Sequence, residues 1–244
     1  DWSGPDFAGQ TRPGCHGGKN RDLTADCTYG RYERARYAGS AGYYYNSANP
    51  AHGGGIVELY AQSLQLDGVI RADGLPGGYP YGSRVAGAGG SIHIEVASFS
   101  GTGELSVRGG LNAYGGSYPT GAGGRISVYT PANTYTGIWQ TGDGSAGSVS
   151  GAGTAYWQDP TAAYGHLTVD NSGRSALEGS TPVRSVGRHS ISGVDQVEAG
   201  VWRIEVADSP WLATDVDYDW GIDGLTVDLD ASEQLSTTYL VESN

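Results

Sequence analysis

The side chains best suited to chemistry occupy equivalent positions in three similar segments, which begin near residues 54, 89 and 123. If these segments lie side by side in register, they bring together an arginine, a histidine, two tyrosines and a glutamate: Arg125, His93, Tyr60, Tyr129 and Glu58. β-Elimination at a uronate uses such a set, because the arginine neutralises the substrate carboxylate while a histidine or tyrosine base removes the α-proton. The alternative, which we favour, is a solvated sheet surface whose outward positions need polar side chains in any case.

A run of aspartates near the C-terminus has the D-x-D-x-D spacing of an oxygen-ligand calcium loop. Its candidate ligands are Asp215, Asp217, Asp219 and Asp223. A complete EF-hand loop would place a glutamate at its twelfth position, where this chain has Thr226. The segment fits equally well as a strand with apolar residues on one face and aspartates on the other. Calcium is therefore one hypothesis here and an ordinary strand is the other.

Aromatic residues of the same C-terminal region form a second candidate site. Trp202, Trp211, Tyr218 and Trp220 would make a platform on which sugar rings stack. Such side chains more often cover the core of a small β module. Carbohydrate binding is therefore the less common of two explanations.

Two cysteines, Cys15 and Cys27, lie in a glycine- and charge-rich stretch. No C-x-x-C or Cys/His spacing accompanies them, so a zinc site is not indicated. We expect one disulfide that closes a short loop, with two free thiols in a reducing compartment as the alternative. The abundance of tyrosine, the single lysine and the expected processing of the chain favour an extracellular or cell-surface protein, and so favour the disulfide.

Composition excludes several classes of function for this chain of 244 residues. A net charge of −12 argues against binding to nucleic acid, whose phosphates would be repelled. The apolar runs are too short for a membrane-spanning helix. No residue is methionine, not even the first, so we expect a mature product or an excised piece.

The elements that must position these residues are β-strands, because no long segment has helical periodicity. Apolar and polar residues alternate instead, as in 57–61 and 92–96, between glycine-rich turns. The segment Gly54–Leu59 recurs as Gly89–Ile94 at an offset of 35 residues and as Gly123–Val128 after a further 34. Residues 167–173 are a weaker echo.

One such unit cannot bury its own apolar side, whereas stacked neighbours can. We therefore predict an all-β fold, a right-handed parallel β-solenoid (β-helix) with a small C-terminal β module; a glycine-rich β-sandwich is the alternative. The expected inward columns are Val57–Ile92–Ile126, Leu59–Ile94–Val128, Ile70–Leu105 and Ala72–Val107.

The glycine-led segments, together with Leu64–Gly74 and the closing Thr238–Asn244, resemble the glycine-rich repeats of large secreted bacterial surface proteins. Those repeats are generally taken to fold as parallel β-solenoids related to the pectate-lyase-like superfold. The resemblance covers residues 50–175 well and the tail loosely, whereas residues 1–45 match it poorly. It implies structural use outside the cell or on its surface, and it transfers no catalytic residues.

Charge divides the chain. Residues 1–189 carry 14 acidic and 13 basic side chains, whereas residues 190–244 carry 12 acidic side chains and one basic one. We predict an N-terminal glycine-rich segment with the disulfide (1–45), a repeat region (46–178) and an acidic β-strand module (179–244).

We expect an extracellular structural or adhesive subunit of a surface fibre or matrix, more readily than an enzyme. Its main partner would be another copy of itself, joined end to end, because open strand edges can template such pairing. The second hypothesis is a polysaccharide-active protein, a uronate lyase or a carbohydrate-binding module, that uses the outward face around His93 and Arg125.

Overall fold

The computed structural model describes residues 14–19, 27–42, 51–77, 85–111, 120–142, 150–162, 165–173, 179–181, 191–198, 201–206, 226–228 and 238–240. These residues form twelve β-strands and no helix. The chain divides into two compact units, Asp1–Pro182 and Val183–Asn244. Within the described ranges, no helix is long and apolar enough to cross a membrane.

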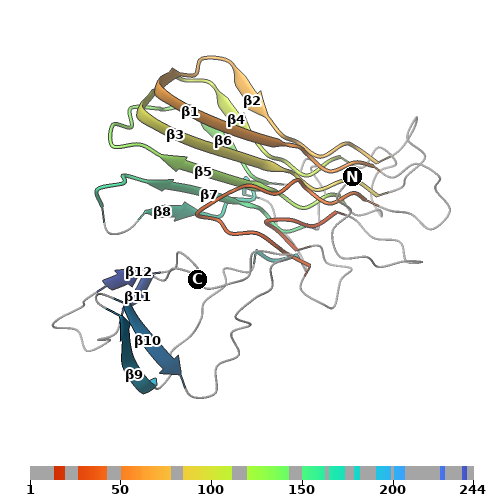
Figure 1. Cartoon of the computed structure of the whole chain (residues 1–244). Coiled ribbons are helices and arrows are strands. Elements are labelled where there is room, and N and C mark those ends of the chain that lie inside the picture. Colours follow the sequence, from red (N-terminus) through yellow and green to blue (C-terminus); the bar gives the residue numbers. More distant parts are fainter. Residues whose placement is uncertain are drawn as a thin grey trace. The chain divides into compact units, whose positions relative to one another are not determined.

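The larger sheet of the first unit has five strands in the order β1 (Ile56–Gln65), β3 (Ser91–Ser100), β5 (Arg125–Tyr129), β7 (Thr154–Gln158) and β8 (His166–Thr168). The first four strands are parallel and run side by side in Figure 1, whereas β8 is antiparallel to β7. Each parallel strand follows a glycine-rich segment, which lets the chain enter the sheet next to its neighbour.

A second, smaller sheet contains three parallel strands in the order β2 (Val69–Arg71), β4 (Glu104–Ser106) and β6 (Ile138–Gln140). β2 follows β1 in the chain, β4 follows β3, and β6 follows β5. Each repeat of the sequence therefore contributes one strand to each sheet.

The apolar core contains residues of both sheets, including Ile92, Ile94, Leu105, Ile126 and Val128. The strand register confirms the columns expected from the repeat. Val57 pairs with Ile92 and Ile92 with Ile126, Leu59 pairs with Ile94 and Ile94 with Val128, and Ile70 pairs with Leu105. Ala72 and Val107 are buried in the same core.

The prediction of a right-handed parallel β-solenoid is wrong. The described strands form four separate sheets with mixed strand directions, and their order is not that of a β-helix. Only seven residues, 159–165, connect β7 to β8, and at their start the Ala162 N–H donates to the Asp159 carbonyl. So short a connection joins antiparallel strands, because a parallel pair needs a long crossover. The echo at 167–173 therefore does not continue the parallel set.

Strand β7 was missed by the sequence analysis. It pairs in parallel with β5, Ile126 facing Ala155 and Val128 facing Trp157. The offset falls to 29 residues, and adjacent bulky residues, Tyr156 and Trp157, replace the apolar alternation. The part of the repeat pattern that remains before β7 is the glycine-rich segment 151–153, which resembles the segments that precede the earlier strands.

The second unit contains two antiparallel pairs. β9 (Ile191–Glu198) pairs with β10 (Val201–Val206), and β11 (Thr226–Asp228) pairs with β12 (Thr238–Leu240). These strands are local hairpin-type pairings, unlike the long-range parallel register of the first unit.

Glycine is required immediately before strands β3 and β5, where neighbouring backbones lie very close together. A Cβ atom on Gly90 would collide with the backbone of Gly54 and Gly55, and one on Gly124 with that of Gly89 and Gly90. Gly55 occupies the equivalent position before the edge strand β1, where a Cβ atom would meet open space.

We predict that Gly90→Ala lowers the free energy of unfolding by about 1–3 kcal/mol, because the backbones must separate to admit the methyl group. Gly55→Ala is the matched control at the equivalent position of the preceding repeat, and it should be near neutral or slightly stabilising. Urea denaturation of both variants measures the difference. Equal effects of the two substitutions would contradict close backbone packing at Gly90.

Candidate functional site

The outer face of the five-stranded sheet gathers the residues that the sequence analysis selected. Glu58 pairs with His93 and His93 with Ser127, Tyr60 pairs with Glu95 and Glu95 with Tyr129, and Ser91 pairs with Arg125. The predicted juxtaposition is thus confirmed. The exposure of these side chains differs, however, from that of a solvated sheet surface.

Residues 27–42, which we call the N-terminal strap, contact this face along the first halves of its strands. Side chains of the sheet bind strap backbone: Arg125 Nε donates to the Tyr29 carbonyl (3.0 Å), Ser91 Oγ to that of Tyr37 (2.7 Å) and Tyr129 OH to that of Glu33 (2.8 Å), while Ser127 Oγ accepts the Ala35 N–H (3.0 Å). The polar columns therefore satisfy the backbone groups of a segment that has no strand neighbours of its own there.

The contacts of Arg125 differ most from the role that its position in the sequence suggested. Its side chain is 3 % exposed, and Nη1 donates to Thr154 Oγ1 at 3.2 Å while Nε binds the strap. A guanidinium in this position does not meet a substrate carboxylate. It anchors the strap to strands β5 and β7 instead.

His93 lies at the centre of a hydrogen-bonded series that runs from a hydroxyl to a carboxylate. Its Nδ1 is 2.7 Å from Ser127 Oγ and its Nε2 is 2.8 Å from Glu95 Oε1. In the neutral imidazole, Nε2–H donates to the carboxylate and the Ser127 hydroxyl donates to Nδ1. Hydroxyl, imidazole and carboxylate in this order are the parts of nucleophilic catalysis. Here His93 and Ser127 are fully buried, so these hydrogen bonds stabilise the covered face of the sheet.

An aromatic row crosses the sheet beside this series. The ring centroids are 5.8 Å apart for Tyr60 and His93, 5.9 Å for His93 and Tyr129, 6.0 Å for Tyr129 and Tyr156, and 5.3 Å for Tyr156 and Tyr32. Burial, and then the nearby Glu33 carboxylate, raises the pKa of Tyr32 to about 12. This ring of the row therefore remains neutral at physiological pH. The row reaches water at Tyr60, and the Glu95 side chain beside it is 49 % exposed.

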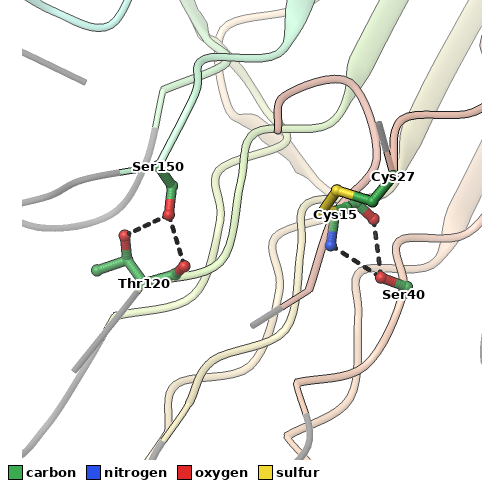
Figure 2. Close-up of a disulfide and its surroundings, with 5 residues drawn as sticks. All are labelled: Cys15, Cys27, Ser40, Thr120 and Ser150. Carbon is green, nitrogen blue, oxygen red and sulfur yellow. Dashed lines mark hydrogen bonds between the residues drawn. A yellow bond between two sulfur atoms is a disulfide. The ribbon is translucent and has the colours of Figure 1, made fainter. Parts of the chain in front are cut away.

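A disulfide ties the beginning of the strap to residues 14–19. The predicted bond between Cys15 and Cys27 is confirmed, with 5.9 Å between the two Cα atoms. Ser40, near the far end of the strap, accepts the Cys15 N–H and donates to the Cys15 carbonyl, both at 2.9 Å (Figure 2). Thr120 and Ser150 form a separate hydroxyl pair in the same view, at 3.0 Å.

His16 is buried beneath the strap. Its ring stacks on Tyr29 with 4.7 Å between centroids, and Nδ1 donates to the Gly89 carbonyl at 2.9 Å. Within the described residues, Nε2 has no hydrogen-bond partner. Burial, and then the positive charge of Arg125, lowers the pKa of His16 to about 3. The neutral form is therefore part of the folded structure.

The C-terminal candidates fall mostly outside the described residues. Those outside are the proposed calcium ligands Asp215, Asp217, Asp219 and Asp223, together with Trp211, Tyr218 and Trp220. Trp202 lies in β10, but its side chain is not among those described. Within the described part of the chain, no group of His, Cys, Asp and Glu side chains has the arrangement of a metal site.

Comparison with known proteins gives no family model, curated protein or solved structure that matches this chain.

We predict that acid weakens the fold through His16. Because its folded pKa, about 3, lies below the unfolded value of 6.5, the unfolded state binds an extra proton between these values. The contribution of His16 to the free energy of unfolding is fully present above pH 6.5. It falls by about 1.4 kcal/mol for each pH unit below that value. His16→Phe keeps a ring against Tyr29 and should flatten this part of the pH profile of unfolding.

The matched control is His52→Phe, which replaces an exposed histidine and should retain the wild-type profile. Chemical denaturation at several pH values between 4 and 7 measures how the free energy of unfolding changes with pH. This range lies between the folded and unfolded pKa values of His16, apart from its upper end. An unchanged slope in His16→Phe would show that His16 does not stay neutral in the fold.

Proposed function

We propose that the protein is an extracellular structural or adhesive subunit of a surface fibre or matrix, and that it self-associates through open strand edges. One observation carries this proposal. β1 and β2 lie at the edges of their respective sheets, and no described strand pairs with their outer sides. Unpaired backbone donors and acceptors of this kind readily bind another strand.

The side chains at this edge support the same proposal. Ile56 is 48 % exposed, Tyr60 57 % and Val69 52 %. Inward-facing Val57 and Leu59 are only partly buried, although their partners on β3, Ile92 and Ile94, are fully buried. Part of the apolar core therefore meets water along β1 and β2, and a partner covering it would gain hydrophobic stabilisation.

The disulfide supports the proposed location outside the cell. Disulfides persist in oxidising compartments and are rare in the cytosol. The Cys15–Cys27 bond holds the strap that covers polar side chains of the sheet, so its loss would affect the structure and not only a terminal loop.

We predict that Ile56→Lys combined with Val69→Lys reduces self-association, because charged side chains on edge strands oppose pairing. Sedimentation velocity over a range of concentrations, with electron microscopy of the same samples, measures the oligomers. Val169→Lys is the matched control, since Val169 is also exposed (45 %) but follows β8, at the edge of the larger sheet opposite β1. A wild-type protein that stays monomeric at high concentration would refute the proposal.

A second candidate function, polysaccharide binding, rests on the aromatic row. Tyr60 is largely exposed beside the exposed carboxylate of Glu95, and aromatic rings with nearby hydrogen-bonding groups suit sugar rings. Binding is a better candidate than cleavage by a lyase, because Arg125 and His93 are buried and Arg125 is bonded to the strap.

For this function we predict that Tyr60→Ala and Glu95→Gln each weaken retention of the protein on immobilised polysaccharides. Affinity electrophoresis against neutral and acidic polymers is the measurement. Val69→Ala, a truncation at an exposed residue of the other sheet, is the control and should not alter retention. Equal retention of wild type and both variants would exclude the aromatic row as the binding surface.

A further inference from the structure

We propose that β1 pairs with β1 of a second copy of this chain, in antiparallel orientation about a two-fold axis at Glu58. This inference rests on the proposed function of self-association, and it specifies the partner and the register. It predicts a dimer whose sheet is continuous across the interface.

The backbone of β1 determines which residues are available for pairing. The Gly55 carbonyl accepts the Ser91 N–H at 3.0 Å, so Gly55 and every second residue after it point their backbone groups toward β3. The intervening residues, Ile56, Glu58 and Tyr60, point theirs toward the open edge. An incoming strand must pair with these three.

The alternation changes in the middle of β1. Ala61 pairs with Val96 and Ser63 with Ser98, but Gln62 has no partner in the register. Beyond this break the core-facing side chain is Leu64 instead of an odd-numbered residue. A regular ladder on the open side is therefore limited to residues 56–60.

Two alternative positions of the axis fail on these grounds. An axis at Tyr60 requires residues 62 and 64 to continue a ladder that breaks there. An axis at Ile56 requires Gly54 to pair with the partner, but Gly54 already donates to the Ala88 carbonyl at 2.8 Å and accepts the Gly39 N–H at 2.9 Å. An axis at Glu58 uses only available backbone groups.

The side chains are complementary in this register. On the outer face, Ile56 of each copy lies opposite Tyr60 of the other, so the two large exposed apolar side chains of β1 cover each other. On the inner face, Val57 of each copy lies opposite Leu59 of the other. Both are partly exposed members of the core, and the pairing makes the two cores continuous.

Glu58 is the unfavourable element of the interface. It lies opposite its own counterpart at the axis, and directly opposed like charges destabilise a strand pair. Within the chain its register partner on β3 is His93, whose ring nitrogens are engaged by Ser127 and Glu95. Glu58→Gln should therefore strengthen the dimer several-fold.

Cysteine cross-linking tests the register. Paired residues in an antiparallel ladder have Cα atoms about 5.5 Å apart, which is within the range of a disulfide. We expect Glu58→Cys to form a covalent dimer on mild oxidation. Ile56→Cys and Tyr60→Cys should each form no covalent dimer alone but a disulfide-linked heterodimer when mixed. The native cysteines are already bonded to each other, and Val169→Cys is the control for random collision.

The outcomes separate the two proposals. Oligomers in sedimentation without a Glu58→Cys cross-link would overturn this inference and leave self-association intact. Cross-linking of Ile56→Cys with itself would also overturn it, because that pattern indicates a parallel or shifted pair. A wild-type protein that is monomeric at all concentrations, with no cross-link above the Val169→Cys control, would overturn both. Stronger association of Glu58→Gln together with the predicted cross-links would support both.

Discussion

Close contact between backbones at the glycine pairs is the constraint on which the first unit depends. Gly89 and Gly90 lie so near the chain segments on either side that neither can carry a Cβ atom, and the same holds for Gly123 and Gly124. These contacts fix where each parallel strand enters the sheet, and so they fix the register. Once the register is set, apolar side chains fall on one face and polar ones on the other, because side-chain direction alternates along a strand. The core and the polar face are therefore two results of one constraint.

The polar face shows how residues that suit catalysis can serve structure. Burying an arginine or a histidine is costly unless each polar group finds a partner. Arg125, His93 and Ser127 find theirs in the strap, in Thr154 and in Glu95. The exchange is mutual, because the strap has few strand contacts and needs hydrogen-bond partners for its own carbonyl and N–H groups. The disulfide and Ser40 hold its ends against residues 14–19, which keeps this pairing in place.

The sequence was informative where a short-range pattern repeats, and uninformative where distant segments meet. The offset between Gly54, Gly89 and Gly123 was enough to predict the pairing of β1, β3 and β5. The disulfide was predicted because the chain has only two cysteines, without a metal-binding pattern, in a composition typical of a secreted protein. Residues 27–42 do not share the repeat, so their contacts with Arg125 and Ser127 left no signal. The reversal at β8 was missed for a related reason. It depends on the short turn at Asp159, whereas the echo at 167–173 suggested continued parallel stacking and so favoured the wrong fold class.

Repetition also explains why one edge of the sheet differs from its interior. Val57 and Leu59 carry the same kind of inward side chain as Ile92 and Ile94, because they belong to the same repeat. The inner strands have neighbours on both sides, whereas β1 has one, so the same pattern that buries β3 leaves β1 partly apolar and exposed. Natural edge strands often carry charge that discourages indiscriminate pairing. Glu58, between Ile56 and Tyr60, has this position. An edge that is apolar at its flanks and acidic at its centre favours a partner that matches its flanks closely enough to offset the central repulsion. In the proposed dimer, β1 of another copy is that partner.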